Sequence, residues 1–350
     1  METKILYIDE KNIDKSVIEE AGAVIRHGGL VAFPTETVYG LGANALDGAA
    51  VKKIFEAKGR PQDNPLIVHI SDFDELAPLV AEVPEIARKL MDRFWPGPMT
   101  IIFKKSLIIP DETSAGLESV GVRMPSNLVA RALIKAAGVP VAAPSANISG
   151  RPSPTEVGSC IEDLSGKVDI IIGGEKCEVG VESSIIDVTD YPPCILRPGG
   201  VTLEMFRTVD ENIYIDPSIL NKSGADFKPK APGMKYRHYA PKAPVRIVQG
   251  EPEKVIALIN EMVQNYINEG KRVGIIATDE TKDRYENGIV VSLGSRSDMD
   301  RITRNLFETL RSFDDKDVSL ILSEAFEEKG KGIAVMNRLK KAAGFDIIKA

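Results

Sequence analysis

The stretch Phe-Pro-Thr-Glu-Thr-Val-Tyr-Gly-Leu-Gly spans residues 33–42 and completes a short apolar run that begins at Leu30. The apolar run predicts a buried strand, and the polar residues after it predict a loop at the end of that strand. Upstream, residues 13–27 carry apolar side chains at helical spacing, and two glycines at 28–29 end the predicted helix. The chain therefore begins as an α/β unit with a polar loop.

Two polar clusters lie farther along the chain, each beside a turn. Lys58 and Arg60 follow a predicted helix at 47–57, and Ser145 and Asn147 follow an apolar strand at 141–143. Lysine offers phosphate oxygens a mobile point charge, whereas arginine offers a planar two-pronged donor. A solvated helix end would also explain Lys58 and Arg60, but the rigid turn at residues 61–65 favours a functional site.

Seven motifs occur in one order between residues 15 and 205, and this order resembles the threonylcarbamoyl-AMP synthases with the YrdC-like domain. Residues 231–241 resemble the linker of the longer, two-domain members of that family. The motifs are Pro-Thr-Glu-Thr-Val-Tyr-Gly-Leu from residue 34, Lys-x-Arg at 58–60, Asn-Pro-Leu-Ile-Val-His at 64–69, Trp-Pro-Gly-Pro-Met-Thr at 95–100, Val-Arg-Met-Pro at 122–125, Ser-Ala-Asn-Ile-Ser-Gly at 145–150 and Glu-Ser-Ser-Ile-Ile-Asp at 182–187.

The alternation of apolar runs and helical patterns predicts two α/β domains. The first, at residues 1–209, resembles the α+β YrdC-like fold, a twisted mixed sheet with helices. Proline-rich residues 210–243 are predicted to form a linker or lid. Residues 244–350 predict a small Rossmann-like, doubly wound domain with a mainly parallel sheet. Strands are expected near 66–70, 99–103, 169–172, 184–188, 194–197, 245–248, 273–277, 289–293, 318–322 and 345–348, and helices near 84–94, 126–137, 154–163, 252–268, 298–312 and 331–343.

Composition and charge limit the possible functions. The 350 residues are 43% hydrophobic and 27% charged, which is typical of a soluble globular protein. The formal net charge of −7 argues against a broad electrostatic grip on tRNA or on a membrane. With no signal peptide or apolar span, we expect a cytoplasmic protein. The isolated Cys160, Cys177 and Cys194 predict buried or unused thiols rather than a metal site.

The resemblance implies a role for each matched residue. Lys58 and Arg60 are the expected catalytic cations. The residues that resemble the threonine side are Thr37, His69, Arg123, Ala143 and Ser183. Those that resemble the ATP side are Lys58, Arg60, Asn64, Ser119, Ser145, Asn147, Ser153, Arg197 and Tyr236. No metal ligand is expected from protein side chains, and Mg²⁺ is expected to arrive with ATP.

Some of these residues allow a second interpretation. Arg123 is costly to bury without an anion, so it either pairs with an internal carboxylate or receives the substrate carboxylate. Ser183 and Ser184 could be turn caps at the start of a strand. The pattern Gly-x-Gly-x-x-Ala at 40–45 matches a dinucleotide loop, although polar residues precede it where that fingerprint requires a buried strand.

The resemblance implies a nucleotidyltransferase, an L-threonylcarbamoyladenylate synthase. Its reaction joins L-threonine, bicarbonate and ATP and releases pyrophosphate. The adenylate would pass to a tRNA threonylcarbamoyl transferase for tRNA modification. We expect no membrane partner and no stable tRNA complex.

Two other functional classes are alternatives to the synthase. A nucleic-acid-binding module would show steep salt dependence, and the acidic net charge disfavours it. A carbamoyl-transfer enzyme of the hydrogenase-maturation type would carry zinc-finger cysteine pairs and an acylphosphatase segment, both absent from this sequence.

Residues 231–241 are rich in aromatic and cationic side chains, so we expect a lid over the loaded site, with a rigid spacer as the alternative.

Overall fold

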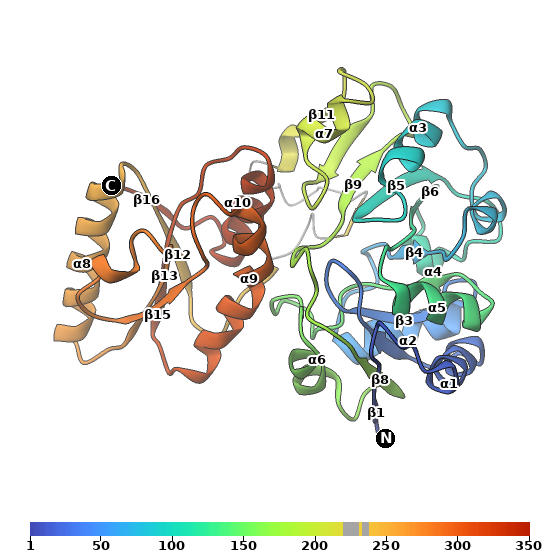
Figure 1. The fold of residues 1–350 in the computed structure, drawn as a ribbon, viewed down its shortest axis with the longest axis horizontal. Helices are drawn as coiled ribbons and strands as arrows, with labels where there is room; N and C mark the ends of the chain where they lie inside the picture. Colours follow the sequence, from blue (N-terminus) through green and yellow to red (C-terminus); the bar gives the residue numbers. More distant parts are fainter. Residues whose placement is uncertain (220–230, 233–237) are drawn as a thin grey trace. The chain divides into compact units, whose positions relative to one another are not determined.

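The computed structural model describes residues 1–219, 231–232 and 238–350 (Figure 1). The chain divides into two compact units. The first unit comprises Met1–Ser149 and Ser153–Lys235, and the second comprises Gly150–Pro152 and Tyr236–Ala350. Within the described ranges, no helix combines the length and apolarity needed to cross a membrane.

The first unit is built on one mixed sheet with helices packed on it (Figure 1). Its described strands, in spatial order, are β1 (Lys4–Tyr7), β8 (Ile170–Gly173), β2 (Val31–Phe33), β3 (Gly40–Asn44), β7 (Val141–Ala142), β4 (Ile67–His69), β6 (Ser119–Arg123), β5 (Met99–Lys104), β9 (Ser184–Asp187), β10 (Cys194–Arg197) and β11 (Tyr214–Ile215). Its helices are α1 (Lys15–Arg26), α2 (Gly48–Lys58), α3 (Glu85–Phe94), α4 (Asp111–Ser114), α5 (Leu128–Ala137), α6 (Val157–Leu164) and α7 (Leu203–Arg207).

Helix α2 shows how local sequence positions the first polar cluster. The Asp47 side chain caps the helix by accepting from the backbone N–H groups of Ala49 and Ala50, at 2.9 and 3.2 Å. The helix ends at Gly59, whose φ of 60° is left-handed and suits a residue without a β-carbon. Lys58 and Arg60 therefore lie on either side of the point where the helix stops.

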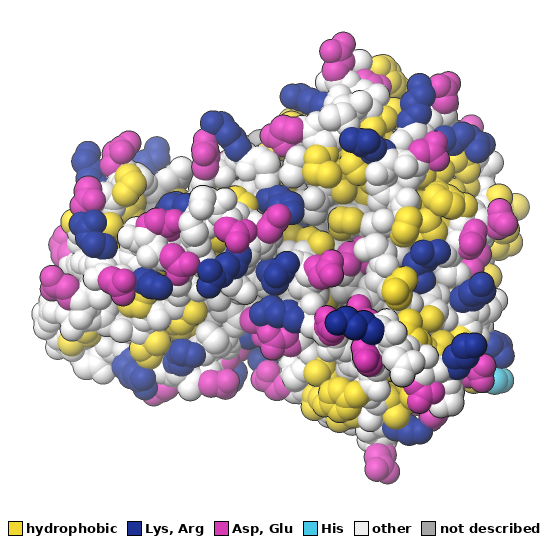
Figure 2. All heavy atoms as spheres, in the orientation of Figure 1, with side chains coloured by type: hydrophobic (Ala, Val, Ile, Leu, Met, Phe, Trp, Pro, Cys, Tyr) yellow, Lys and Arg dark blue, Asp and Glu magenta, His cyan; other side chains and the backbone are white. Residues whose placement is uncertain are grey.

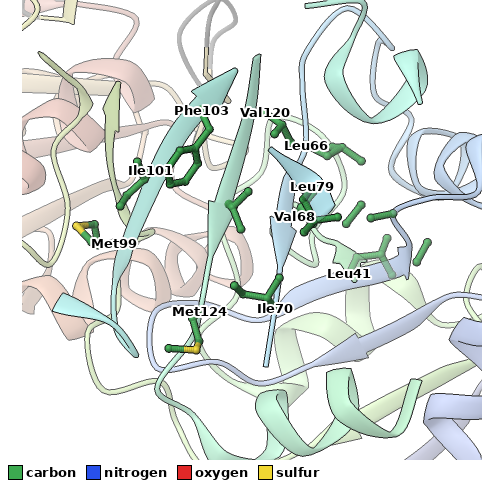
Figure 3. Close-up of a cluster of buried hydrophobic side chains, with 14 of the residues drawn as sticks. Leu41, Leu66, Val68, Ile70, Leu79, Met99, Ile101, Phe103, Val120 and Met124 are labelled. Carbon is green, nitrogen blue, oxygen red and sulfur yellow. The ribbon is translucent and has the colours of Figure 1, made fainter. Parts of the chain in front are cut away.

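Alternation along the central strands gives the first sheet two different faces. Val68, Val122 and Ile101 lie in the largest apolar cluster, whose members on β4, β5 and β6 are shown in Figure 3. The residues between them point to the opposite face, because side chains alternate along a strand. On β6 these are Ser119, Gly121 and Arg123. One face of the strands therefore belongs to the main core, and the other carries Ser119 and Arg123 beside a smaller apolar cluster that includes Ile67 and Ile102.

The second unit is a doubly wound domain with an all-parallel sheet. Its strand order is β14 (Ile289–Ser292), β13 (Val273–Ala277), β15 (Leu320–Glu324), β12 (Val245–Gln249) and β16 (Ile347–Lys349). Its helices are α8 (Pro252–Asn268), α9 (Met299–Ser312) and α10 (Lys331–Ala342). Figure 1 shows α8 on one side of this sheet and α9 and α10 on the other. These two units confirm the predicted fold, a mixed sheet followed by a Rossmann-like domain.

Two segments differ from their sequence-based interpretations. Residues 40–44, which match a dinucleotide loop, form strand β3, which pairs with β2 in antiparallel register. Residues 214–215, which the sequence assigns to the linker, form β11 and pair with β10. A two-residue edge strand among prolines carries no periodic signal, so the sequence could not show it.

Candidate active site

Three polar side chains form a row on the face of the first sheet that lies opposite its main core. His69, Arg123 and Thr100 are direct neighbours, because β4 pairs with β6 at His69 and Arg123, and β6 pairs with β5 at Arg123 and Thr100. All three are buried. The expected threonine-side residues His69 and Arg123 are therefore brought together by strand register alone.

Arg123 forms a buried ion pair that its position in the sequence did not reveal. Its Nη2 atom lies 2.7 Å from Oε1 of Glu36, and both side chains are about 5% exposed. The internal-carboxylate interpretation of Arg123 thus describes this structure. Yet Nε of Arg123 and Oε2 of Glu36 have no hydrogen-bond partner in the described part of the chain. Each member of the pair keeps one buried polar atom unsatisfied, which is uncommon in native proteins.

His69 is held as a neutral imidazole. Burial lowers its pKa from 6.5 to about 3, and the neighbouring Arg123 guanidinium contributes to this shift. Its Nδ1 lies 3.1 Å from the carbonyl oxygen of Ile67, so Nδ1 is the protonated nitrogen and donates. The Nε2 lone pair is then left as an acceptor.

Thr37 and Ser183 border this row from two loops. Thr37 is fully buried in the loop after β2, where its hydroxyl lies 2.9 Å from that of Thr35. Its carbonyl oxygen accepts from Gly180 at 3.1 Å, which ties this loop to the segment that leads into β9. Ser183 is also fully buried, and its hydroxyl lies 2.8 Å from that of Thr100.

Arg197 reaches Ser183 from the end of β10. Its Nε donates to the Ser183 carbonyl oxygen at 3.0 Å, and its Nη2 donates to the Ser183 hydroxyl at 3.1 Å. Ala143, which follows β7, donates its backbone N–H to Ile67 at 2.9 Å. The five threonine-side residues and Arg197 therefore occupy adjoining strands and loops.

The lysine of the first polar cluster reaches into the second. Lys58 is only 2% exposed, and its ammonium donates to the carbonyl oxygens of Ser145 and Asn147. The Ser145 hydroxyl donates in turn to the Asn147 side chain. Eighty-seven residues separate Lys58 from Ser145. The solvated-helix-end interpretation of Lys58 is therefore wrong.

Arg60 and Asn64 stand on the turn that follows α2. The Arg60 guanidinium lies 5.9 Å from the centroid of the Phe55 ring. Asn64 is 1% exposed, yet neither its amide nitrogen nor its side-chain oxygen has a hydrogen-bond partner within the described ranges. A buried amide without partners costs folding free energy, so this position indicates a group that is satisfied by a ligand.

The remaining ATP-side residues are less closely grouped. Ser153 donates to a carboxylate oxygen of Glu182 at 2.6 Å. Ser119 lies four residues before Arg123 on β6, at the other end of that strand, where it lines a cavity of about 10 Å³ with Pro65. That volume holds about one water molecule.

Tyr236 lies outside the described residues, so its expected contact with the nucleotide stays a prediction. Tyr239 is described and is 3% exposed. Its ring stacks on Phe307 of α9 at 5.1 Å, and the Arg338 guanidinium lies 5.7 Å from its centroid. Tyr239 is therefore a core residue of the second unit in this structure.

Sequence reasoning did not single out Glu36, Thr100 or Glu182. Each contacts an expected site residue, Arg123, Ser183 and Ser153 respectively. Glu36 and Glu182 lie inside the quoted motifs. A search of these motifs for a carboxylate that could balance the charge of Arg123 could therefore have proposed them. Thr100 ends its motif and carried no distinguishing signal.

Among the described residues, no group of three or more His, Cys, Asp or Glu side chains is arranged to hold a metal ion. On the face drawn in Figure 2, cationic and acidic side chains are interspersed. That face shows no broad basic patch of the kind that nucleic-acid binding requires.

Comparison with known proteins identifies the family. Residues 23–199 match a family model described as "Telomere recombination", and residues 201–344 match one described as "Threonylcarbamoyl-AMP synthase, C-terminal domain". A threonylcarbamoyl-AMP synthase of Pyrococcus abyssi is 50% identical, and one of Bacillus subtilis is 45% identical. These alignments cover 99% of both chains for the first relative and 100% of both for the second.

A solved structure supports the same assignment. The crystal structure of P. abyssi Sua5 complexed with L-threonine is 50% identical, covers 99% of this chain and 100% of that chain, and superposes with a TM-score of 0.94. Sequence, family models and structure agree over both units. The chain belongs to the threonylcarbamoyl-AMP synthase family.

Proposed function

We propose that this protein is an L-threonylcarbamoyladenylate synthase, a nucleotidyltransferase that converts L-threonine, bicarbonate and ATP into threonylcarbamoyl-AMP and pyrophosphate. The observation that carries the proposal is the buried Glu36–Arg123 pair, with one unsatisfied polar atom on each side chain, beside His69. A zwitterionic amino acid supplies one partner for each atom. The relative with the same fold was crystallised with L-threonine, which supports this assignment.

The threonine side of the proposal follows from the charges in the row. Arg123 receives the carboxylate through its planar guanidinium. The Nε2 of neutral His69 accepts from the threonine hydroxyl. Thr37, Ala143 and Ser183 lie beside the same row and complete the proposed threonine site. Because His69 and Arg123 come from strands in fixed register, little reorganisation of these two residues is needed when the substrate binds.

The chemical step needs positioning and charge stabilisation rather than a protein nucleophile. The threonine ammonium loses a proton, and its nitrogen forms a carbamate with bicarbonate as water leaves. A carbamate oxygen then attacks the α-phosphorus of ATP, and the bond to the β-phosphate oxygen breaks with release of pyrophosphate. Lys58 and Arg60 stabilise the growing negative charge on the phosphates.

The remaining ATP-side residues hold the nucleotide. Asn64 offers an unsatisfied amide. The other proposed contacts are Ser119, Ser145, Asn147, Ser153, Arg197 and Tyr236. Mg²⁺ belongs to the substrate as its ATP complex, where phosphate oxygens and water supply most of the ligands. The described residues carry no cluster that would form a separate protein-bound metal centre. The labile product passes to a transferase that modifies tRNA.

A substrate-omission assay tests this function. Pyrophosphate release from ATP is followed with both co-substrates, without L-threonine, and without bicarbonate in carbon-dioxide-depleted buffer. We expect release only when both are present, because the carbamate is the nucleophile. Serine in place of threonine should support slower release, since one methyl group contributes only about 1–3 kcal/mol to discrimination. Equal ATP cleavage without threonine would disprove the proposal.

A further inference from the structure

A second cavity lies within the C-terminal unit, at the carboxyl ends of its parallel strands. Its volume is about 280 Å³, close to the lower limit of typical small-molecule pockets. Residues at or just beyond the ends of β12 and β15 line it, together with the first turns of α8 and the loop after β14. None of these residues belongs to the site proposed above.

The topology places this cavity where open α/β sheets bind ligands. Strands β12 and β15 are neighbours in the sheet. After β12 the chain crosses over β15 to form β13, whereas after β15 it crosses over β12 to form β16. The two connections therefore leave the neighbouring strands in opposite directions. Helix α8 follows β12 on one face of the sheet, whereas α10 follows β15 on the other (Figure 1). Such a switch point opens a crevice between the two strand ends.

A charged cluster is built into this crevice. Glu324, the last residue of β15, is 1% exposed. One of its oxygens accepts from the hydroxyls of Thr281 and Tyr285, and the other accepts from Nη2 of Arg296. Both carboxylate oxygens are thus engaged by donors from the surrounding segments. Glu324 therefore acts as a fixed anchor for the guanidinium.

Arg296 is anchored but not saturated. Its Nη1 donates to the Ala325 carbonyl oxygen at 3.2 Å, and its guanidinium lies 5.3 Å from the centroid of the Phe326 ring. Its backbone N–H is held by Glu280 at 3.0 Å, which fixes the loop. A guanidinium has five N–H donors, and the described residues supply acceptors for two of them. The side chain is 39% exposed, so the remaining donors are open to a ligand.

The rest of the lining defines the kind of ligand. Val248, Val255 and Ile256 form an apolar wall of the cavity. Helix α8 begins at Pro252 beside this wall and has no side-chain cap, so the N–H groups of the first turn after Pro252 add positive potential. Glu327 is the other carboxylate in the lining, and its charge is balanced by Lys329 at 2.6 Å.

We propose that this crevice is a second small-molecule site, which binds a phosphate-bearing metabolite no larger than a nucleoside monophosphate. Arg296 holds the phosphate, and the apolar wall packs against the flat or apolar body of the ligand. The cavity shares no lining residue with the proposed active site, whose catalytic cations Lys58 and Arg60 lie in the first unit.

Hydrogen-exchange mass spectrometry on the full chain tests this site, with AMP, adenosine and inorganic phosphate as separate probes. We expect AMP to slow exchange in residues 249–256 and 293–297, and adenosine to have no effect there. Protection by inorganic phosphate alone would also support the site, because the anion is the group recognised. The proposal is overturned when neither AMP nor phosphate protects these segments, or when adenosine protects them as strongly as AMP.

Variants separate binding from a general change in the domain. Arg296→Gln should raise the AMP concentration needed for half-maximal protection by at least about tenfold, which is the effect of losing a charged hydrogen bond. Arg296→Lys keeps the charge but loses the planar fork, so it provides a second test if the first variant unfolds, with weakened protection again expected. Arg246→Gln is the matched control, since Arg246 is a half-buried arginine on β12 that pairs with Asp346 at 2.8 Å outside the cavity. Full protection in both Arg296 variants would overturn the proposal.

Discussion

Each unit contains a buried glutamate that pairs with an arginine, but the two pairs are completed in opposite ways. In the first unit, Glu36 and Arg123 are both about 5% exposed, and each keeps a buried polar atom without a partner. In the second, Glu324 is saturated by two hydroxyls and a guanidinium, while Arg296 stays 39% exposed. The first pair keeps unsatisfied hydrogen-bonding atoms inside the protein, whereas the second presents an anchored cation at the surface.

The two pairs indicate two different ways of binding a ligand. An unsatisfied buried pair costs stability until a substrate completes it, which suits a site that recognises a zwitterion. A saturated carboxylate costs less and mainly orients its arginine, which suits capture of an anion. Variants that neutralise one partner should separate the two cases.

The largest effect is expected from breaking the first pair. Glu36→Gln leaves the Arg123 charge buried without a counter-charge, so the free energy of unfolding should fall by about 3–5 kcal/mol. Arg296→Gln should cost only about 1 kcal/mol, because the pair is partly exposed and Glu324 keeps two hydroxyl donors. Urea unfolding of both variants measures the difference. Equal losses would remove the distinction between the pairs.

Two substitutions in the first unit sharpen the assignment of its cations. Arg60→Ala should lower kcat by about 10²–10³, since Arg60 is assigned to charge that grows in the transition state. Arg123→Lys preserves the pairing charge for Glu36 but loses the two-pronged geometry, so the KM for threonine should rise about tenfold or more with ATP little affected. Identical losses in threonine and ATP affinity for both variants would show that the division of roles is wrong.

A smaller effect concerns pH. The pKa of His69 is about 3 in the folded state and 6.5 as the reference for the unfolded chain. Between pH 6.5 and pH 3 only the unfolded chain binds the proton. The contribution of neutral His69 to the free energy of unfolding is therefore fully present above pH 6.5 and is lost as the pH is lowered toward 3. The contribution is at most about 1.4 kcal/mol per pH unit. His69→Gln should flatten the pH dependence of the unfolding free energy between pH 6 and 4, and an unchanged slope would contradict the buried neutral imidazole.

The smallest effect on stability is expected at Asn64. Because its buried amide has no hydrogen-bond partner among the described residues, Asn64→Ala should change the free energy of unfolding by no more than about 1 kcal/mol. The same variant should weaken ATP binding by about tenfold, through loss of a hydrogen bond to the ligand. Isothermal calorimetry and urea unfolding measure the two quantities on one sample. Strong destabilisation with unchanged ATP affinity would assign Asn64 to the fold alone.

Periodicity predicted most helices and strands because apolar runs and caps are local signals. The helix at 252–268 and the strand at 273–277 have the same bounds in the structure as in the prediction. Strand β3 was missed because its glycines resemble a turn, and β11 because it has two residues. The site contacts depend on long-range register, such as the pairing of Glu36 with Arg123 across 87 residues, so no local pattern could show them. The roles given to the site residues stay predictions until the variants are measured.

The most direct test of the central claim is to identify the product of the reaction. The protein is incubated with ATP, L-threonine and ¹³C-labelled bicarbonate, and the mixture is analysed at once by mass spectrometry. We expect one labelled species that contains the threonine, the bicarbonate carbon and the AMP moiety, formed in step with pyrophosphate. Production of ADP and phosphate, or of AMP without the labelled carbon in an adenylate, would contradict it.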